Sequence, residues 1–267
     1  MKNLIRILFI GDIVGDPGVH AVTGIVPGWL KEEPFDLVIA NGENASSGRG
    51  ITIKQVKPIL NAGVHVITGG NHIFDREKAP DAFGMYAERL LRPANYPPDV
   101  MGRGFVIVQV PGKRPVAILN LQGRLYMPLT DCPFQTTDRI LPELLAITPN
   151  IFVDFHGEAT AEKIAFAKNF DGQVSAIAGT HTHVPTADAE ILPLGTAFIT
   201  DVGMTGSHDG VIGMDTAASI KRFRTTLNHQ SGGSSGDIRL NAAIIEIDAD
   251  TGKGISIVHQ QRKMPAL

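Results

Sequence analysis

Two histidines separated by a single residue lie in the segment AGTHTHVPTAD, residues 178–188. In a strand or extended turn, residues i and i+2 project to the same side, so His181 and His183 can face one site. Two imidazoles that face the same way repel each other when both are protonated. A purely structural role is therefore harder to assign to this pair than to a single histidine.

Side chains able to bind a metal follow this apolar run and four others. The five runs are LIRILFI, FDLVIA, VHVIT, NIFVDF and VSAIAG, and each has the composition of a buried strand. Ligand sites in α/β sheets lie beyond the carboxyl ends of the strands, so groups placed there can converge. The residues that follow the runs are Asp12, Glu43, Asn44, Asn71, His72, His156, His181 and His183.

Most of these residues have a structural explanation when they are considered alone. Asp12 has the type of a cap or turn residue. Loop, turn or half-buried structural roles account equally well for Glu43, Asn44, Asn71, His72 and His156. Their repeated placement after five strands favours a shared site instead. We expect structural or surface roles for the remaining histidines, which are His20, His65, His208, His229 and His259.

Without His72, the set contains seven side chains, too many for one tetrahedral zinc ion. Two metal ions bridged by a carboxylate would use them all. Imidazole, carboxylate and amide groups without a thiolate favour iron, manganese or zinc. Two such ions about 3.5–4 Å apart stabilise both the attacking and the leaving oxygen of an in-line displacement. The set therefore predicts hydrolysis of a phosphoester.

The elements that must position these residues are ten strands and six helices. Besides the five runs above, strands are predicted at FVIVQV, PVAILNL, TAFIT, NAAIIEI and GISIVHQ. Helical patterns cover residues 18–33, 52–62, 79–91, 137–146, 160–170 and 215–225. This mixture predicts an α/β protein with mixed sheets covered by helices, in a single domain over residues 1–267. The low-complexity stretch at 228–237 is predicted to be a surface loop, with a lid as the alternative.

Composition limits the classes of partner and location. The chain has 267 residues, is 43% hydrophobic and carries a net charge of −3, which disfavours binding to long nucleic acid. Cys132 is the only cysteine, which suits a reducing compartment. The apolar run near the start is interrupted by Arg6 and is interpreted as a strand rather than a signal peptide. No apolar stretch approaches the roughly 18 residues of a membrane span, so we expect a cytoplasmic protein.

Six motifs in order resemble the YmdB-like branch of the calcineurin-like metallophosphoesterases, from Leu8 to about Arg224. Val14 stands where the wider superfamily has a histidine in its first motif. The second motif of the superfamily is Gly-Asp, and here Glu43 takes the place of the aspartate and is followed by Asn44. The YmdB-like branch shows the same departures. The resemblance implies two mixed sheets flanked by helices in α-β-β-α layers, and it suggests self-association. The motifs are GDIVGDPG, NGENAS, TGGNHIFD, DFHGEAT, GTHTHVPTAD and TDVGMTG.

The resemblance also implies a role for each ligand-type residue. Glu43 would bridge the two ions, and His72 would donate a proton to the leaving oxygen. The expected substrate class is 2′,3′-cyclic mononucleotides. One ion would be bound by Asp12, Glu43, Asn44 and His183, and the other by Glu43, Asn71, His156 and His181.

Two further residues are candidates for supporting roles. Arg124 follows another predicted strand and could bind a phosphate, with an ordinary surface arginine as the alternative. Asp201 could accept a hydrogen bond from a metal-bound histidine. Two other functions remain open from the sequence. One is a phosphomonoesterase or 5′-nucleotidase on the same core, and the other is a regulatory protein that binds a nucleotide with little turnover.

Overall fold

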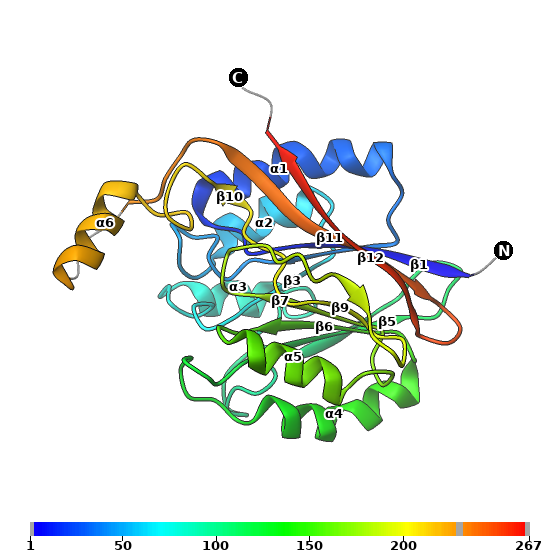
Figure 1. Cartoon of the computed structure of the whole chain (residues 1–267). Helices are drawn as coiled ribbons and strands as arrows, with labels where there is room; N and C mark the ends of the chain where they lie inside the picture. The colour runs from blue at the N-terminus through cyan, green and yellow to red at the C-terminus, as the bar shows by residue number, and fades with distance from the viewer. Residues whose placement is uncertain (1–2, 228–231, 265–267) are drawn as a thin grey trace.

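A computed structural model of the chain describes residues 3–227 and 232–264, which form two six-stranded sheets and six helices (Figure 1). The first sheet has the order β10-β11-β1-β2-β3, with β12 paired to β11. Strands β1, β2 and β3 are parallel, while β11 is antiparallel to β1, β10 and β12. Its strands are β1 (Leu4–Ile10), β2 (Leu37–Asn41), β3 (Val66–Thr68), β10 (Gly206–Ser207), β11 (Ile238–Asp248) and β12 (Gly254–Lys263).

The second sheet has the order β4-β5-β6-β7-β9-β8. Strands β5, β6, β7 and β9 are parallel, and the antiparallel strands β4 and β8 lie at the two edges. Its strands are β4 (Phe105–Val108), β5 (Val116–Gln122), β6 (Ile151–His156), β7 (Ala176–Thr180), β8 (Glu190–Ile191) and β9 (Ala197–Ile199).

The sheets pack face to face, and helices cover their outer faces. One apolar cluster fills the space between the sheets, where Phe9 of β1 meets Phe152 of β6 at 4.9 Å between ring centroids. The outer face of the first sheet packs on α1 (Gly15–Glu32), α2 (Ile53–Asn61) and α3 (Ala79–Met85). The second packs on α4 (Pro133–Ile147) and α5 (Thr160–Asn169). The α-β-β-α layers and the α/β class predicted from the sequence are confirmed (Figure 1).

Apolar periodicity explains why these segments form these elements. In α1 the buried residues recur every three or four positions from Gly18 through Ala21, Val22 and Ile25 to Trp29, as in an amphipathic helix. Strand β1 is almost entirely buried because the central strands of both sheets are covered on both faces. Among the described residues, no helix is both long and apolar enough to cross a membrane.

Three features differ from the sequence prediction. The helix expected over residues 79–91 ends at Met85, because the chain then turns to pair with β3. There, the Ile67 amide donates to the Arg89 carbonyl at 2.7 Å, and the Leu91 amide donates to the Ile67 carbonyl at 2.8 Å. This pairing buries Leu90 and Leu91. The two-residue strands β8 and β10 were not predicted, because two residues are too few to show a period.

Only part of the segment predicted to be a surface loop, 228–237, is described. Residues 228–231, with His229, lie outside the described residues. The Asp215 amide donates to the Gly232 carbonyl at 3.0 Å, and the Ser234 amide donates to the Gly213 carbonyl at 2.9 Å. The described part therefore lies against residues 213–215, and its role as a lid or connection stays a prediction.

Candidate metal centre

The ends of five strands meet at one edge of the sandwich, and both sheets contribute to the group. β1, β2 and β3 of the first sheet lead into Asp12, Glu43, Asn44 and Asn71, while β6 and β7 of the second lead into His156, His181 and His183. Contacts cross between the sheets: Asp12 Oδ2 accepts a hydrogen bond from the His181 amide at 3.0 Å. All seven residues predicted as ligands are therefore brought together.

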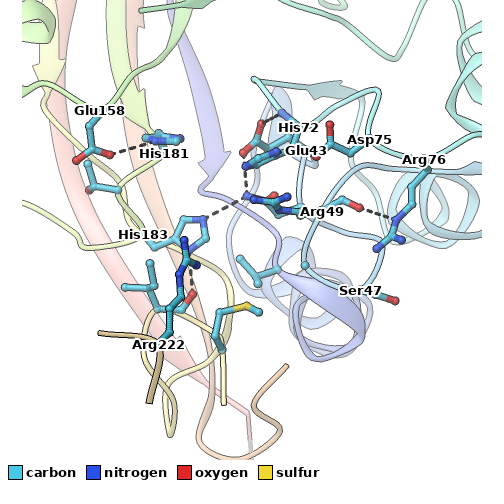
Figure 2. A pocket seen from close by; sticks show the side chains of 16 residues that line it. Glu43, Ser47, Arg49, His72, Asp75, Arg76, Glu158, His181, His183 and Arg222 are labelled. Atoms are coloured by element: carbon cyan, nitrogen blue, oxygen red, sulfur yellow. Dashed lines mark hydrogen bonds and ion pairs between the residues drawn. The ribbon is translucent and has the colours of Figure 1, made fainter. Parts of the chain in front are cut away.

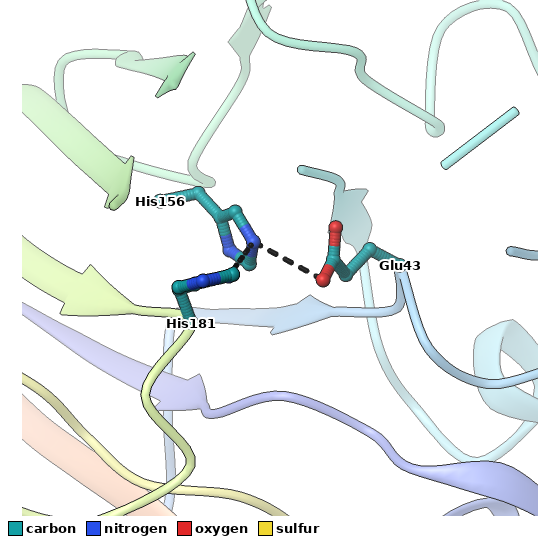
Figure 3. A group of neighbouring side chains, drawn as sticks. All are labelled: Glu43, His156 and His181. Carbon is teal, nitrogen blue, oxygen red and sulfur yellow. Dashed lines mark hydrogen bonds and ion pairs between the residues drawn. The ribbon is translucent and has the colours of Figure 1, made fainter. Parts of the chain in front are cut away.

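His156 Nε2 is the point on which one group of ligand atoms converges. It lies 3.1 Å from Glu43 Oε1 and 3.0 Å from His181 Nδ1 (Figure 3). It also lies 3.1 Å from Asn71 Oδ1. A ring nitrogen carries at most one proton, so it cannot satisfy three such neighbours. Ligands at right angles around a metal about 2.1 Å away would lie about 3.0 Å apart. The spacing of these atoms therefore fits a bound cation.

A second group surrounds Asn44 and also includes Glu43. The Asn44 amide nitrogen lies 2.8 Å from Glu43 Oε1 and 3.3 Å from His183 Nε2. Asn44 Oδ1 and Asp12 Oδ1 are buried and have no hydrogen-bond partner among the described residues. An unsatisfied buried oxygen costs about 1–3 kcal/mol, and two in one site are explained if both are metal ligands.

Gly70 leaves the room that this group needs. A Cβ atom at this position would overlap both His156 and Glu43. The Gly-Gly pair that follows β3 therefore lets the loop carrying Asn71 pass close beside the carboxylate. A bulkier residue at position 70 would push the ligand atoms apart.

The charges of the group are strongly coupled. Burial alone would raise the pKa of Glu43, but the neighbouring His156 outweighs it and lowers that pKa to about 2. Burial opposes protonation of His156, but Glu43 and Asp12 raise its pKa to about 9. Burial and the adjacent His156 lower the pKa of His181 to about 3. The proton on His156 thus balances the Glu43 charge, and a metal cation would take over that role.

The two neighbouring histidines lie in a turn and not in a strand. β7 ends at Thr180, and His181 and His183 have φ of 103° and 66°. The alternation of side chains that is expected in an extended segment therefore does not explain where the two rings point. Positive φ costs about 1–3 kcal/mol for residues other than glycine, and such strain clusters at functional sites. The turn aims the two rings at different neighbours, His181 at His156 and His183 at Asn44.

Hydrogen bonds behind the site fix the orientation of His156. Its Nδ1 lies 2.9 Å from Thr180 Oγ1, which donates to Asp154 Oδ1 at 2.7 Å. Asn41 also donates to Asp154, at 2.9 Å to Oδ2. Burial raises the pKa of Asp154 to about 6. This arrangement leaves Nε2 pointing into the ligand group, as in metal sites where a second hydrogen bond orients each histidine.

A cavity of about 780 Å³ opens above the ligands (Figure 2). His72 lines it, and its Nδ1 lies 2.8 Å from Asp75 Oδ2, so Nε2 is free to act toward the cavity. The His72 amide donates to Glu43 Oε2 at 2.9 Å. Glu158 Oε2 lies 3.1 Å from His181 Nε2. The cavity therefore contains a candidate proton donor next to the candidate ligands.

Comparison with known proteins now identifies the family. Residues 8–259 match the family model described as YmdB-like protein. The chain belongs to the YmdB-like family. A curated relative of the YmdB-like chain, the 2′,3′-cyclic-nucleotide 2′-phosphodiesterase of Bacillus subtilis (strain 168), is 46% identical over 252 residues. The match covers 94% of this chain and 95% of the relative.

Two solved structures share the fold of the YmdB-like chain over nearly its full length. A hypothetical protein from Thermus thermophilus has a TM-score of 0.92 and 37% identity, covering 98% of this chain and 100% of that one. A phosphatase from Mycoplasma pneumoniae has a TM-score of 0.91 and 34% identity, covering 98% and 95%. The resemblance seen in the motifs is confirmed.

Two supporting residues of the YmdB-like chain lie elsewhere than expected. Arg124 is exposed and is not among the described residues that line the cavity; its backbone amide donates to Glu162 Oε1 at 2.9 Å. Among the described residues, Asp201 accepts no hydrogen bond from a histidine ring. Its Oδ2 accepts from Lys163 Nζ at 2.8 Å and from the Thr182 amide at 3.1 Å, so it holds the histidine turn through its backbone.

Sequence reasoning missed several residues of the cavity wall. Glu158, two positions after His156, was interpreted only as part of a helix start. Asp75 lies one helical turn after His72, a spacing that could have suggested their pairing. The three arginines follow no strand end, so no comparable signal marks them. The missed residues are Arg49, Asp75, Arg76, Glu158 and Arg222.

Proposed function

We propose that this chain hydrolyses small cyclic phosphodiesters, specifically 2′,3′-cyclic mononucleotides, at a centre that holds two metal ions. The observation that carries this proposal is the convergence of three ligand atoms on His156 Nε2, beside two buried oxygens that accept no hydrogen bond from the described residues. The activity named for the Bacillus subtilis relative, at 46% identity, supports this substrate class.

The two groups described above correspond to the two ion sites. When bound, the ions would lower the pKa of water and neutralise charge on the phosphoryl oxygens. Glu43 Oε1 lies 2.8 Å from the Asn44 amide nitrogen and 3.1 Å from His156 Nε2, so this oxygen contacts both groups, which supports its role as the bridge. One site comprises Asp12, Glu43, Asn44 and His183, and the other comprises Glu43, Asn71, His156 and His181.

His72 is the proposed general acid. Asp75 accepts the proton of Nδ1 and so orients the ring with Nε2 toward the cavity. An imidazole in this position is suited to donate a proton to a departing alkoxide.

The reaction consumes one water for each phosphodiester. The water oxygen forms a bond to phosphorus and its proton passes to solvent, while the bond from phosphorus to O2′ breaks. His72 Nε2 gives its proton to O2′ and is reprotonated from solvent. The products are a 3′-phosphate and a free 2′-hydroxyl.

The test combines metal analysis with turnover of three substrates. We expect about two metal ions per chain, and faster hydrolysis of 2′,3′-cyclic AMP than of 3′-AMP or p-nitrophenyl phosphate. The Glu43→Ala variant serves as the control and should lose metal and activity together. Preferred hydrolysis of 3′-AMP would instead assign a phosphomonoesterase. Tight binding of one nucleotide with no turnover of any substrate would assign a regulatory role.

Three further properties belong to the same proposal. The ligand set, which has no thiolate, suits iron or manganese, with zinc as an alternative. We propose a cytoplasmic location, supported by the single cysteine, Cys132. Self-association is proposed from the family resemblance alone.

A further inference from the structure

Helix α6 (Thr216–Thr225) projects from the body of the molecule (Figure 1). It carries cationic residues on both sides of an aromatic residue in the sequence. Its sequence TAASIKRFRT contains Lys221, Arg222 and Arg224 and no acidic residue. Only Ser219 is buried, and Phe223 is 78% exposed between the two arginines. A ten-residue helix with so little packing is marginally stable in water, so a ligand that covers its exposed side would stabilise it.

The helix is also connected to the metal centre through the cavity wall. Arg222 lines the cavity and lies beside His183 in Figure 2. Arg49 and Arg76 lie on the opposite wall, where Arg76 Nε donates to the Arg49 carbonyl at 2.8 Å. Arg222 therefore places a positive charge between the ligand group and α6, while the cavity lining also contains the carboxylates of Glu43, Asp75 and Glu158. A phosphate that leaves the cavity toward α6 would pass Arg222.

We propose that α6 binds the nucleotides preceding a 2′,3′-cyclic phosphate at the 3′ end of short single-stranded RNA. This extends the proposed function from mononucleotides to RNA ends and rests on it. Phe223 offers a ring on which one base stacks, and Lys221 and Arg224 pair with backbone phosphates. The chemical step is unchanged: water adds to phosphorus, the bond to O2′ breaks and O2′ takes a proton, leaving a 3′-phosphate end.

Charge favours this occupant over a second copy of the chain. Two α6 helices packed against each other would oppose three cations with three cations, which disfavours association. RNA supplies the opposite charge and an aromatic face together. The whole chain carries a net charge of −3, so contacts with nucleic acid are confined to this local surface and to a few nucleotides.

The test compares a mononucleotide with a short RNA on the intact enzyme. The substrates are 2′,3′-cyclic AMP and a five-nucleotide RNA ending in a 2′,3′-cyclic phosphate. We expect Phe223→Ala to lower kcat/KM for the RNA about tenfold and to leave that for 2′,3′-cyclic AMP unchanged. The control is Leu145→Ala, which removes an exposed hydrophobic side chain from α4 and should change neither value. Lys221→Gln with Arg224→Gln should also weaken the salt dependence of RNA turnover.

A binding measurement separates this proposal from the proposed function. Fluorescence anisotropy with the same RNA ending in a 3′-hydroxyl reports affinity without any reaction, and Phe223→Ala should weaken it by a similar factor. If wild type binds this RNA but cleaves no cyclic phosphate, the proposed function fails while binding by α6 stands. Equal RNA affinity and equal RNA turnover in Phe223→Ala and wild type would overturn the α6 proposal. A change of oligomeric state in Phe223→Ala with unchanged RNA affinity would also overturn it, because α6 would then bind a second copy of the chain.

Discussion

At the scale of single residues, His72 differs from its neighbours because its ring makes a hydrogen bond to Asp75 and not to a proposed ligand. Its backbone amide meets Glu43, while its ring pairs with Asp75. We predict that His72→Ala retains both metal ions and lowers kcat by about 10²–10⁴, the usual contribution of a general acid. Metal content and kcat are measured on the same sample. Asp75→Asn should lower kcat less, because His72 keeps its ring and loses only the carboxylate that orients it. Loss of metal in His72→Ala would contradict the assignment.

The histidine pair makes a second prediction at this scale. His181 belongs to the group around His156, and His183 faces Asn44. We expect His181→Ala and His183→Ala each to lose one of two metal ions, and to lose different ones. The measurement is metal stoichiometry, with spectroscopy of a cobalt- or manganese-loaded sample to distinguish the sites. Identical spectra for the two variants would show that the pair does not divide between two ions.

Residue types alone indicated which side chains are candidate metal ligands, but not which residues hold those side chains in place. Asp12 and His156 were found because a polar group after an apolar strand is conspicuous. Lys163 gave no signal, since a lysine in a helical pattern normally faces water. It is buried because Asp201, distant in sequence, offers it a carboxylate. Such pairing depends on the tertiary fold.

At the scale of elements, Lys163 ties α5 to the end of β7. Its Nζ donates to the Thr180 carbonyl and to Asp201 Oδ2, both at 2.8 Å. Removing one partner of a buried ion pair leaves the other charge uncompensated, which costs about 3–5 kcal/mol. We therefore predict that Lys163→Met lowers the free energy of unfolding by about 3 kcal/mol, measured by urea denaturation. Lys168→Met, on an exposed position of the same helix, is the matched control. If Lys163→Met and Lys168→Met lose the same free energy of unfolding, the buried ion pair of Lys163 does not stabilise the fold.

His259 of β12 links the first sheet to the segment after β9. Its Nε2 lies 3.2 Å from the Val202 carbonyl, and burial lowers its pKa below the ordinary value of 6.5. The unfolded chain therefore binds the proton more readily than the folded one. This contribution to stability is complete above pH 6.5 and decreases as the pH falls toward the lower folded pKa. We predict that His259→Gln flattens the pH dependence of Tm between about pH 7 and 5. A parallel pH profile in wild type and variant would contradict it.

Secondary structure was predictable where a period extends over several residues. The strands of the parallel cores and helix α1 repeat their apolar pattern long enough to be recognised. Residues 86–91 show why other secondary structure could not be predicted. Leu90 and Leu91 continue a helical spacing, yet pairing with Ile67 buries both side chains in an extended segment. A contact between segments thus outweighs local propensity.

At the scale of the whole molecule, the proposed centre lies where the two sheets meet. Asp12, Glu43 and Asn71 come from the first sheet, and His156 and His181 come from the second. The sequence indicated five strand ends with ligands, but the division between sheets depends on strand order, which periodicity does not encode. Bound metal would therefore connect the sheets at one edge, in addition to the apolar layer between them.

This placement makes stability depend on metal. A ligand present at about 100 times its Kd stabilises the folded state by about 2.7 kcal/mol. For a chain of this size we predict that chelation lowers Tm by on the order of 5 °C, measured by calorimetry before and after metal removal. Glu43→Gln should show no further decrease on chelation. Phe152→Ala, which opens the layer between the sheets, should lower Tm equally with and without metal. If chelation removes the metal from wild type without changing Tm, the ions do not connect the sheets.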